Sequence, residues 1–214
     1  MNSPFLDRLA QGPLLADGAM GTLLFQHGIP FERCFDELNV AHASLVESIH
    51  REYLAAGAEM IETNTFGANA IRLAAHGLED RAAVLARQGV KVARNAREIA
   101  GTTAFVAGSM GPLGKALVPF GSVTPAEAEV VFRTQAEGLL EGGLDVFVLE
   151  TFQDLTEILA AIRAIRSVTA ELPIIAQMTF GQDGKTRYGH TPALVVRALK
   201  QAGADVVGVN CGVG

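Results

Sequence analysis

Short apolar segments alternate with longer segments of helical periodicity along the 214-residue chain. The apolar segments have the length of β-strands and contain few polar residues, which is typical of parallel strands that are covered on both faces. Strands that alternate with helices predict βαβ units and therefore an α/β fold with a parallel sheet. The six predicted strands are residues 14–16, 60–65, 104–109, 146–150, 174–178 and 206–210.

The segments between these strands carry the signals of amphipathic helices. Leu45 and Ile49, for example, lie four positions apart and therefore on the same face of a helix. Thr124 suits an N-cap, Pro125 suits the first helical position, and Glu127 stands where it can close a capping box. The predicted helices span residues 43–56, 79–99, 124–140 and 193–201.

Three eight-residue segments beginning at Gly57, Gly143 and Gly203 repeat one pattern. Each has the glycine that ends a helix, an acidic residue two positions later, an apolar strand, and a polar residue seven positions after the glycine. The carboxyl ends of parallel strands lie at one edge of a sheet, where α/β proteins bind ligands, so these polar residues are expected to share a rim. Polar residues can also simply mark the end of any strand. The residues at the rim positions are Asn64, Glu150 and Asn210, followed by Thr65, Thr151 and Cys211.

The composition limits the classes of protein to which the chain can belong. Hydrophobic residues make up 49% of the sequence and charged residues 19%, which excludes an intrinsically disordered chain. The net charge of −6 and the lack of a Lys/Arg cluster argue against nucleic-acid binding, and no apolar run is long enough to cross a membrane. With two distant cysteines and no signal peptide, we expect a single cytoplasmic domain.

The end of the first predicted strand is a candidate ligand site. Asp17 is followed by Gly18 and Ala19, so backbone N–H groups beside a carboxylate can approach a ligand closely. Such a site could bind both the ammonium and the carboxylate of an amino acid, although an Asp-Gly pair is also a common turn. This segment lacks the Gly-x-Gly-x-x-Gly pattern of dinucleotide-binding proteins, and the chain has no P-loop motif.

Glu150 and Cys211 are further candidates. Glu150 ends a strongly apolar strand, where a carboxylate is unfavourable unless it is paired, so it could anchor a helix cap or bind a cationic ligand. Cys211 could be a packing residue, a nucleophile or a ligand of a soft metal ion. We expect Cys34 to be a packing residue. His42 and His50 are expected to face solvent, because they fall on a predicted helix with Glu and Arg neighbours. No two histidines have the spacing of metal ligands, which argues against a histidine metal site.

Several motifs follow one another in a specific order along essentially the whole chain. They are Asp-Gly-Ala-Met-Gly-Thr at 17–22, Cys-Phe-Asp-Glu-Leu-Asn at 34–39, Ile-His-Arg-Glu-Tyr-Leu at 49–54, Ala-Gly-Ala at 56–58, Glu-Thr-Asn-Thr-Phe-Gly at 62–67, Leu-Glu-Thr-Phe at 149–152 and Gly-Val-Asn-Cys-Gly at 208–212. In this combination the sequence resembles the homocysteine S-methyltransferase family. The family includes the zinc-dependent, homocysteine-binding barrel of methionine synthase, also in the version fused to a methylenetetrahydrofolate reductase.

The resemblance implies a TIM (β/α)8-type barrel. Residues 1–214 would then form one homocysteine-binding methyltransferase domain, the N-terminal three-quarters of the barrel, with about six parallel strands and outer helices. The resemblance also implies a Zn²⁺ ion held by three cysteines, one of which is Cys211. The other two form a Cys-Cys pair after the eighth strand of the family, and this sequence contains no such pair. We therefore expect a chain truncated after the sixth strand and inactive on its own.

The resemblance further implies roles for individual residues at the strand ends. Asp17 and Glu150 would bind the ammonium group of homocysteine, and nearby backbone amides would bind its carboxylate. Asn210 would support the metal site from behind the ligands. The substrate contacts implied in this way are Asp17, Gly18, Ala19, Thr65 and Glu150.

The implied reaction is transfer of a methyl group to the homocysteine thiol, activated by zinc, with methionine as product. The methyl donor stays open between methylcobalamin charged from methyltetrahydrofolate, S-methylmethionine and betaine. Downstream cobalamin, folate or reductase domains of the same polypeptide are possible partners. One alternative is an inactive remnant with residual ligand binding. Another is a barrel aldolase or isomerase, which would need a Schiff-base lysine or a phosphate-binding loop. No lysine lies at a predicted strand end, because Lys115 and Lys185 fall in loops and Lys91 and Lys200 in helices.

Overall fold

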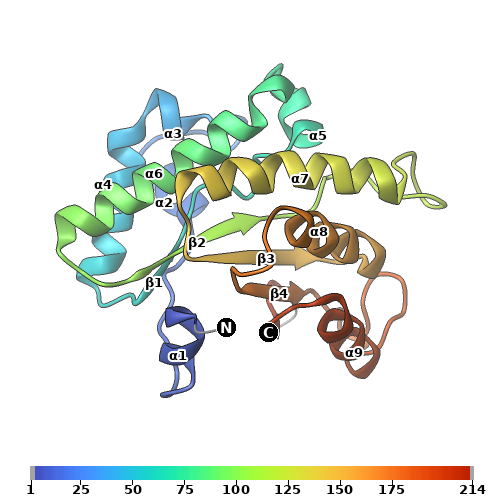
Figure 1. Ribbon diagram of the computed structural model, residues 1–214. Coiled ribbons are helices and arrows are strands. Elements are labelled where there is room, and N and C mark those ends of the chain that lie inside the picture. The colour runs from blue at the N-terminus through green and yellow to red at the C-terminus, as the bar shows by residue number, and fades with distance from the viewer. Residues whose placement is uncertain (1–2, 213–214) are drawn as a thin grey trace.

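Five parallel strands and the helices that connect them form the protein. The computed structural model describes residues 3–212. The strands are β1 (Met60–Glu62), β2 (Phe105–Met110), β3 (Val146–Phe152), β4 (Ile174–Met178) and β5 (Val206–Val209), and the helices are α1 (Pro4–Leu9), α2 (Met20–Gln26), α3 (Leu38–Ala41), α4 (Ala43–Ala55), α5 (Ala70–Leu73), η1 (Ala74–His76), η2 (Glu79–Arg81), α6 (Ala82–Ala100), α7 (Pro125–Gly142), α8 (Leu155–Val168) and α9 (Pro192–Ala202). The strands pair in chain order, β1-β2-β3-β4-β5. Helices α4, α6, α7, α8 and α9 pack side by side along the outside of the sheet (Figure 1).

The first predicted strand, residues 14–16, forms one parallel bridge between Ala16 and Met60 instead of a strand. The backbone N–H of Asp17 donates to the Met60 carbonyl at 3.0 Å, so the segment still lies beside β1. The backbone pairing with β1 does not continue beyond Asp17. The Glu62 N–H donates to the side chain of Asp17 (Oδ2) at 2.9 Å instead of to a backbone carbonyl. The expectation of about six strands is therefore corrected to five strands and a bridge.

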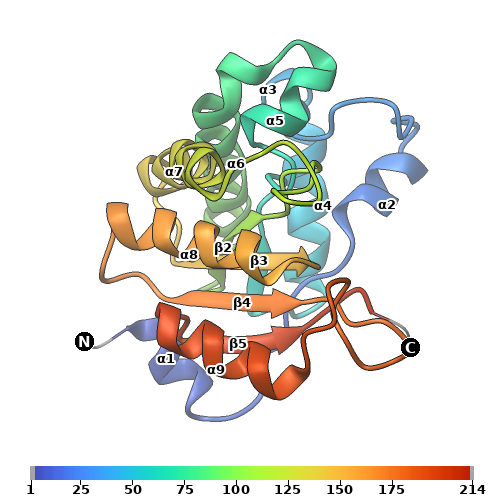
Figure 2. The same cartoon turned by 90° about the vertical axis from the view of Figure 1, so that its right-hand side faces the viewer.

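Alternate residues of the strands face two different cores, as the two-residue period of a strand requires. In β3, Phe147 and Leu149 pack in the core beneath the helices, whereas Val146 and Val148 pack in an inner cluster. Phe5 of α1 belongs to this inner cluster, and Figure 2 shows α1 near the end of the sheet where the strands begin. Parallel strands in chain order, an inner core and an outer layer of helices are the arrangement of a TIM-type barrel, as the sequence predicts.

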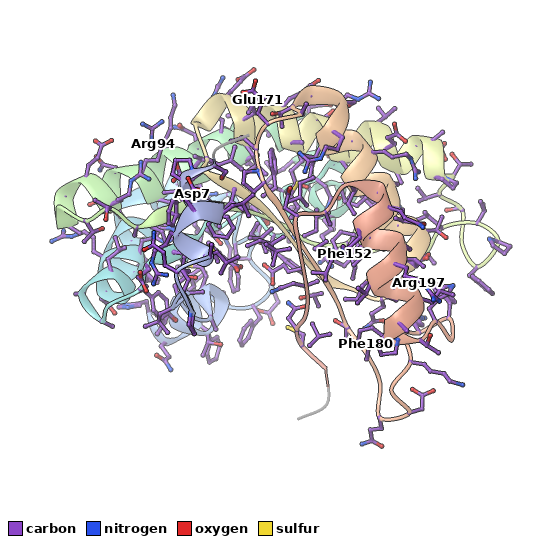
Figure 3. The ribbon with its side chains drawn as sticks, turned by 60° about the horizontal axis from the view of Figure 1, so that its bottom comes forward. Asp7, Arg94, Phe152, Glu171, Phe180 and Arg197 are labelled. Carbon is purple, nitrogen blue, oxygen red and sulfur yellow. The ribbon has the colours of Figure 1, made fainter. Side chains whose placement is uncertain are left out.

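The predicted helices lie close to their expected positions. The capping box of α7 is present: the Thr124 N–H donates to Glu127 Oε2 at 2.8 Å, and the Glu127 N–H donates to Thr124 Oγ1 at 3.2 Å. Thr191 precedes α9 in an extended conformation but makes no capping hydrogen bond with its side chain. Figure 3 labels Phe152, which is fully buried, and Arg197, which is exposed on α9. None of the helices within residues 3–212 has the length and apolar character needed to span a membrane.

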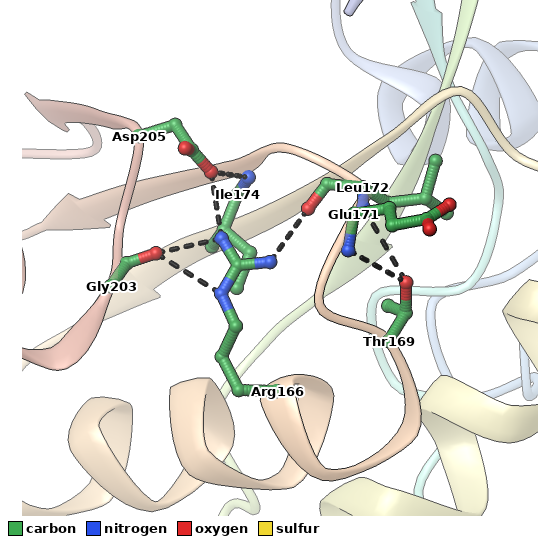
Figure 4. Close-up of polar contacts among 7 residues, drawn as sticks. All are labelled: Arg166, Thr169, Glu171, Leu172, Ile174, Gly203 and Asp205. Atoms are coloured by element: carbon green, nitrogen blue, oxygen red, sulfur yellow. Dashed lines mark hydrogen bonds and ion pairs between the residues drawn. The ribbon is translucent and has the colours of Figure 1, made fainter. Parts of the chain in front are cut away.

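Acidic residues of the repeated segments hold the beginnings of neighbouring strands together. Asp205 accepts hydrogen bonds from the Ile174 backbone N–H at 2.8 Å and from Arg166 Nη2 at 2.7 Å (Figure 4). Asp145 likewise accepts hydrogen bonds from the Val106 backbone N–H, near the start of β2, at 2.8 Å and from Arg97 Nη1 of α6 at 2.7 Å. These acidic residues of the repeat therefore stabilise the fold, and they lie at the end of the sheet opposite to the predicted rim.

His50 is buried, so the prediction that it faces solvent is wrong. It lies on the inward face of α4 together with Val46, Ile49 and Leu54. Neither of its ring nitrogens has a hydrogen-bond partner within the described part of the chain. Burial lowers the pKa of His50 from 6.5 to about 4, because the charged imidazolium would lose its hydration. His42, just before α4, is exposed as predicted.

We expect His50 to make the free energy of unfolding fall by about 2 kcal/mol between pH 7 and pH 5. The folded state binds the proton less readily than the unfolded state, whose histidine titrates near 6.5, so protonation below that pH favours unfolding. In urea unfolding at both pH values, His50→Leu should lack this contribution, whereas His42→Gln should behave like the parent. A His50→Leu variant that retained the full pH dependence would contradict a buried, neutral His50.

Candidate functional site

A cavity of about 920 Å³ lies at the carboxyl ends of the strands. Its walls come from the loop that follows the Ala16 bridge, from the ends of β1, β2 and β3, and from the segment after β5. Figure 2 shows the strands of the sheet running toward this edge, at which the described chain also ends. The predicted site residues in the wall are Asp17, Gly18, Ala19, Glu150 and Cys211.

The loop that carries Asp17 is packed against Tyr53 of α4. The Tyr53 hydroxyl donates to the Ala19 carbonyl at 3.2 Å. A Cβ atom on Gly18 would lie 2.9 Å from that hydroxyl, so any larger residue would have to displace the tyrosine ring. The hydrogen bond from the Glu62 N–H holds the Asp17 carboxylate at the wall of the cavity. The small residues after Asp17 thus allow a close packing of this loop that brings its backbone to the cavity.

Glu150 and Asn210, which the repeat places at equivalent strand ends, are in direct contact. Ser109 Oγ donates to Glu150 Oε1 at 2.6 Å, and Asn210 Nδ2 donates to Glu150 Oε2 at 3.2 Å. The orientation of the Asn210 amide is fixed because its Oδ1 accepts the Thr151 N–H at 2.8 Å. Asn64 lines the same cavity, although its side-chain amide donates to a backbone carbonyl. The structure therefore brings the three equivalent positions to one rim.

Glu62 is a further carboxyl group in the cavity, beside Asp17 and Glu150, and the sequence reasoning did not identify it as a site residue. It ends β1 and lines the cavity together with Asp17 and Glu150. Burial, as the largest cause, and the negative charges of Glu150 and Asp17 together raise the pKa of Glu62 to about 9. The sequence signal that points to Glu62 is its position as an acidic residue directly after the apolar pair at 60–61.

Asp17, Glu62 and Glu150 lie close together in the wall of the cavity. Burial is also the main reason why the pKa of Asp17 is raised to about 7, with the charge of Glu150 contributing. None of the ion pairs found within residues 3–212 involves Asp17, Glu62 or Glu150. Ionised carboxyl groups gathered in this way repel one another, and the repulsion is relieved either by protonation or by a bound cation. This part of the wall is therefore suited to a ligand with an ammonium group, although Arg33, Arg72 and Lys115 also line the cavity.

Two residues beside these carboxyl groups have strained backbones. Thr151 has a φ angle of 64° and Cys211 one of 48°, in the left-handed region that non-glycine residues avoid at a cost of about 1–2 kcal/mol each. The Thr151 hydroxyl donates to Cys211 Sγ at 3.5 Å and accepts from Asn210 Nδ2 at 3.0 Å. Strain of this kind gathers at functional sites, where the surrounding contacts impose it.

The described residues do not by themselves complete a metal site. Within residues 3–212, no group of three or more His, Cys, Asp or Glu side chains has a suitable arrangement. Cys211 is exposed and offers the cavity one cysteine sulfur, a donor atom that Zn²⁺ prefers. Cys34 is buried and packs in a core cluster with Leu73 and Leu85, as predicted, although it also lines the cavity. A zinc site with three cysteines therefore needs ligands beyond the described residues.

Thr65 does not reach the cavity, so the predicted rim contact is corrected. Its side chain is fully buried, and its hydroxyl donates to the Ser109 carbonyl at 2.7 Å. The reason is that β1 already ends at Glu62 and the chain then turns, with the Thr65 N–H donating to the Thr63 carbonyl at 2.8 Å. Thr63 and Asn64 line the cavity at this strand end.

The sequence profile of the homocysteine S-methyltransferase family matches residues 14–213. The chain belongs to this family. It is 33% identical to methionine synthase of Mycobacterium tuberculosis and 32% identical to methionine synthase of Mycobacterium leprae, each over 226 aligned residues. Both alignments cover 100% of this chain and 19% of the relative, so the chain spans about a fifth of the length of these methionine synthases.

Solved structures of the homocysteine methyltransferase MmuM from Escherichia coli have the same fold. The oxidized form matches with a TM-score of 0.84 and 26% identity, over 98% of this chain and 77% of that chain. The metallated form matches with a TM-score of 0.82 and 28% identity, over 98% of this chain and 78% of that chain. The α/β fold inferred from the sequence is thereby confirmed as part of a TIM-barrel-like homocysteine methyltransferase fold.

Proposed function

We propose that this chain is the homocysteine-binding part of an enzyme that transfers a methyl group to the thiol of homocysteine and releases methionine. The observation that carries the proposal is the group of Asp17, Glu62 and Glu150, which form no ion pair within residues 3–212, in a cavity that Cys211 also lines. Membership of the family, and the similarity to methionine synthases and to a homocysteine methyltransferase, support the proposal. The activity of the whole protein is part of what we propose, since the chain spans about a fifth of these methionine synthases.

The proposed binding mode uses both charged groups of the amino acid. The carboxylates of Asp17 and Glu150 bind the ammonium group, and the backbone amides of Gly18 and Ala19 bind the carboxylate. Hydrogen bonds to charged groups are stronger than those between neutral groups, and the half-buried wall reduces competition from water. The homocysteine thiol then extends toward the part of the cavity that Cys211 lines.

We propose Cys211 as one ligand of a Zn²⁺ ion whose other ligands come from outside the described residues. Bound zinc would lower the pKa of the substrate thiol and hold it as a nucleophilic thiolate. Asn210 supports this arrangement through Thr151, since it binds both the N–H and the hydroxyl of that residue. In the proposal, methylcobalamin or methyltetrahydrofolate supplies the methyl group through other domains of a longer cytoplasmic polypeptide, and neither nucleic acid nor membrane is a partner.

A second candidate function concerns residues 1–214 alone. These residues offer one exposed thiol at the cavity and no completed metal site within 3–212. We propose that they bind homocysteine weakly and do not transfer methyl groups.

The proposed activity is tested with the zinc-loaded whole protein. Isotope-labelled homocysteine is supplied with methylcobalamin, methyltetrahydrofolate, S-methylmethionine or betaine in separate reactions, and labelled methionine is measured by mass spectrometry. We expect methionine with the first or second donor. The absence of methionine with all four donors would overturn the proposal.

A further inference from the structure

We propose that a second, smaller cavity beside the homocysteine site binds an anionic group, a carboxylate or a phosphate, of a second ligand. This cavity has a volume of about 300 Å³ and adjoins the larger one, since Phe66, Arg72, Gly114, Lys115 and Thr151 line both. Binding of an anion in the smaller cavity does not depend on the proposed function. The assignment of that anion to the methyl donor does rest on it.

Arg72 of α5 lies where the two cavities meet, and its guanidinium group is held in place. Its Cζ lies 5.1 Å from the centre of the Phe66 ring, and its Nε donates to the Pro112 carbonyl at 2.7 Å. Its charge helps to lower the pKa values of Asp36 and Glu157, but Arg72 forms no ion pair within residues 3–212. Its two terminal amino groups have no hydrogen-bond acceptor among these residues either. A planar guanidinium group of this kind can bind a carboxylate or a phosphate with two parallel hydrogen bonds.

Two further cations line the smaller cavity, and each comes from a different loop. Lys115 lies in the loop after β2 and Arg187 in the loop after β4, and both are exposed. Neither is part of an ion pair in the portion of the chain that the structure describes. Positive charges from three separate segments therefore meet at one cavity, where their fields add.

The two carboxyl groups that line the same cavity already have backbone partners. Asp154 Oδ1 accepts the Thr156 N–H at 2.8 Å as the N-cap of α8, and Glu157 Oε1 accepts the Leu113 N–H at 2.7 Å. Burial is the main reason why the pKa of Glu157 is raised to about 7, so this group carries only part of a negative charge at neutral pH. The three cations therefore exceed the negative charge of the cavity, and the excess favours an anionic ligand.

The position of the smaller cavity indicates the source of the anion. Because it shares a wall with the cavity in which homocysteine is proposed to bind, its ligand would lie next to that substrate. A methyl donor has to lie next to homocysteine in order to react with the thiol. Methyltetrahydrofolate, S-methylmethionine and betaine carry carboxylates, and methylcobalamin carries a phosphate. The site is therefore assigned to the anionic group of the methyl donor.

Titration of the zinc-loaded whole protein with inorganic phosphate tests the site without a methyl donor. Phosphorus NMR detects weak binding, and saturating homocysteine keeps phosphate out of the substrate site. The double substitution Lys115→Gln with Arg187→Gln should weaken phosphate binding by about 10-fold or more, as expected for loss of hydrogen bonds to a charged group. Arg72→Lys keeps the charge but loses the two parallel hydrogen bonds, so it should weaken binding about 10-fold as well.

Lys91→Gln and Lys200→Gln are the matched controls for these variants. Both lysines are exposed, on α6 and α9, and neither lines the cavity, so their removal should leave phosphate binding as in the parent. Phosphate bound elsewhere in the whole protein would contribute equally to parent and variants. Equal phosphate binding in the parent, the double variant and Arg72→Lys would overturn the proposal.

Methyl transfer assays separate the possible sources of the anion. In the double variant, KM should rise about 10-fold for the donor whose anionic group occupies the site, while the Kd for homocysteine stays unchanged. An unchanged KM for all four donors, together with weaker phosphate binding, would overturn the assignment to the methyl donor and support the anion site. A failure of the parent to bind homocysteine would instead overturn the proposed function, and the phosphate titration would still decide whether the anion site exists.

Discussion

Replacing Asp17 or Glu150 with alanine should weaken homocysteine binding to the whole protein by about 10- to 100-fold. Each carboxylate is expected to form a charged hydrogen bond with the substrate ammonium, and such a bond contributes about 1.5–3 kcal/mol. The zinc content should stay unchanged, because neither residue is a proposed metal ligand. Isothermal titration calorimetry of the zinc-loaded variants measures the affinity, and elemental analysis measures the metal.

Glu141→Ala provides the control for these two variants. Glu141 lies on α7, is exposed, and forms a surface ion pair with Arg87, so its removal should leave the Kd for homocysteine unchanged. Unchanged Kd values in both Asp17→Ala and Glu150→Ala would contradict the assignment of the two carboxylates. Loss of zinc together with affinity would show that they act through the metal site instead.

Replacing Cys211 with serine should remove most of the zinc and nearly all of the methyl transfer activity of the whole protein. A neutral hydroxyl is a poor ligand compared with a thiolate, so a site that depends on three thiolates should not survive the change. Cys34→Ser is the matched control, since Cys34 is buried and lies beside Asp36. It should keep both zinc and activity.

Metal analysis of the two cysteine variants decides the role of Cys211 without reference to activity. A Cys211→Ser protein with as much zinc as the parent would rule out Cys211 as a ligand. Zinc loss in both variants would point to a general loss of structure, which circular dichroism would reveal.

The layered fold could be predicted because its determinants are local in the sequence. Apolar runs predict strands β2 to β5, the apolar pair Met60 and Ile61 predicts the start of β1, and the Thr124–Glu127 capping box predicts the start of α7. The segment 14–16 was expected to form a strand for the same reason. It forms only a bridge because the Asp17 side chain takes the place of a backbone partner, and side-chain competition of this kind leaves no periodic signal.

The residues of the candidate site could be predicted from the repeat only where the strands end at the same edge of the sheet. Glu150 lies near the end of β3 and Asn210 directly follows β5, so the repeat places them side by side. β1 ends after three residues, and the turn that follows carries Thr65 into the interior. The same short strand places Glu62 in the cavity, although its position in the repeat corresponds to the interior of the other strands.

His50 was misplaced for a different reason. Its charged neighbours along the sequence, Arg51 and Glu52, indicated a solvated helix face. Burial of a helical residue depends on its angular position, and His50 falls on the face that packs inward with Val46 and Ile49.

The central claim is that the acidic wall of the cavity binds the ammonium group of homocysteine. It is tested most directly by calorimetric titration of the zinc-loaded whole protein with homocysteine and with the analogue in which hydrogen replaces the amino group. Both compounds keep the thiol and the carboxylate, so they differ only in the group that Asp17 and Glu150 are proposed to bind. The account predicts that the analogue binds at least about 10-fold more weakly, in line with the loss of a charged hydrogen bond. Equal affinities for the two compounds would contradict it.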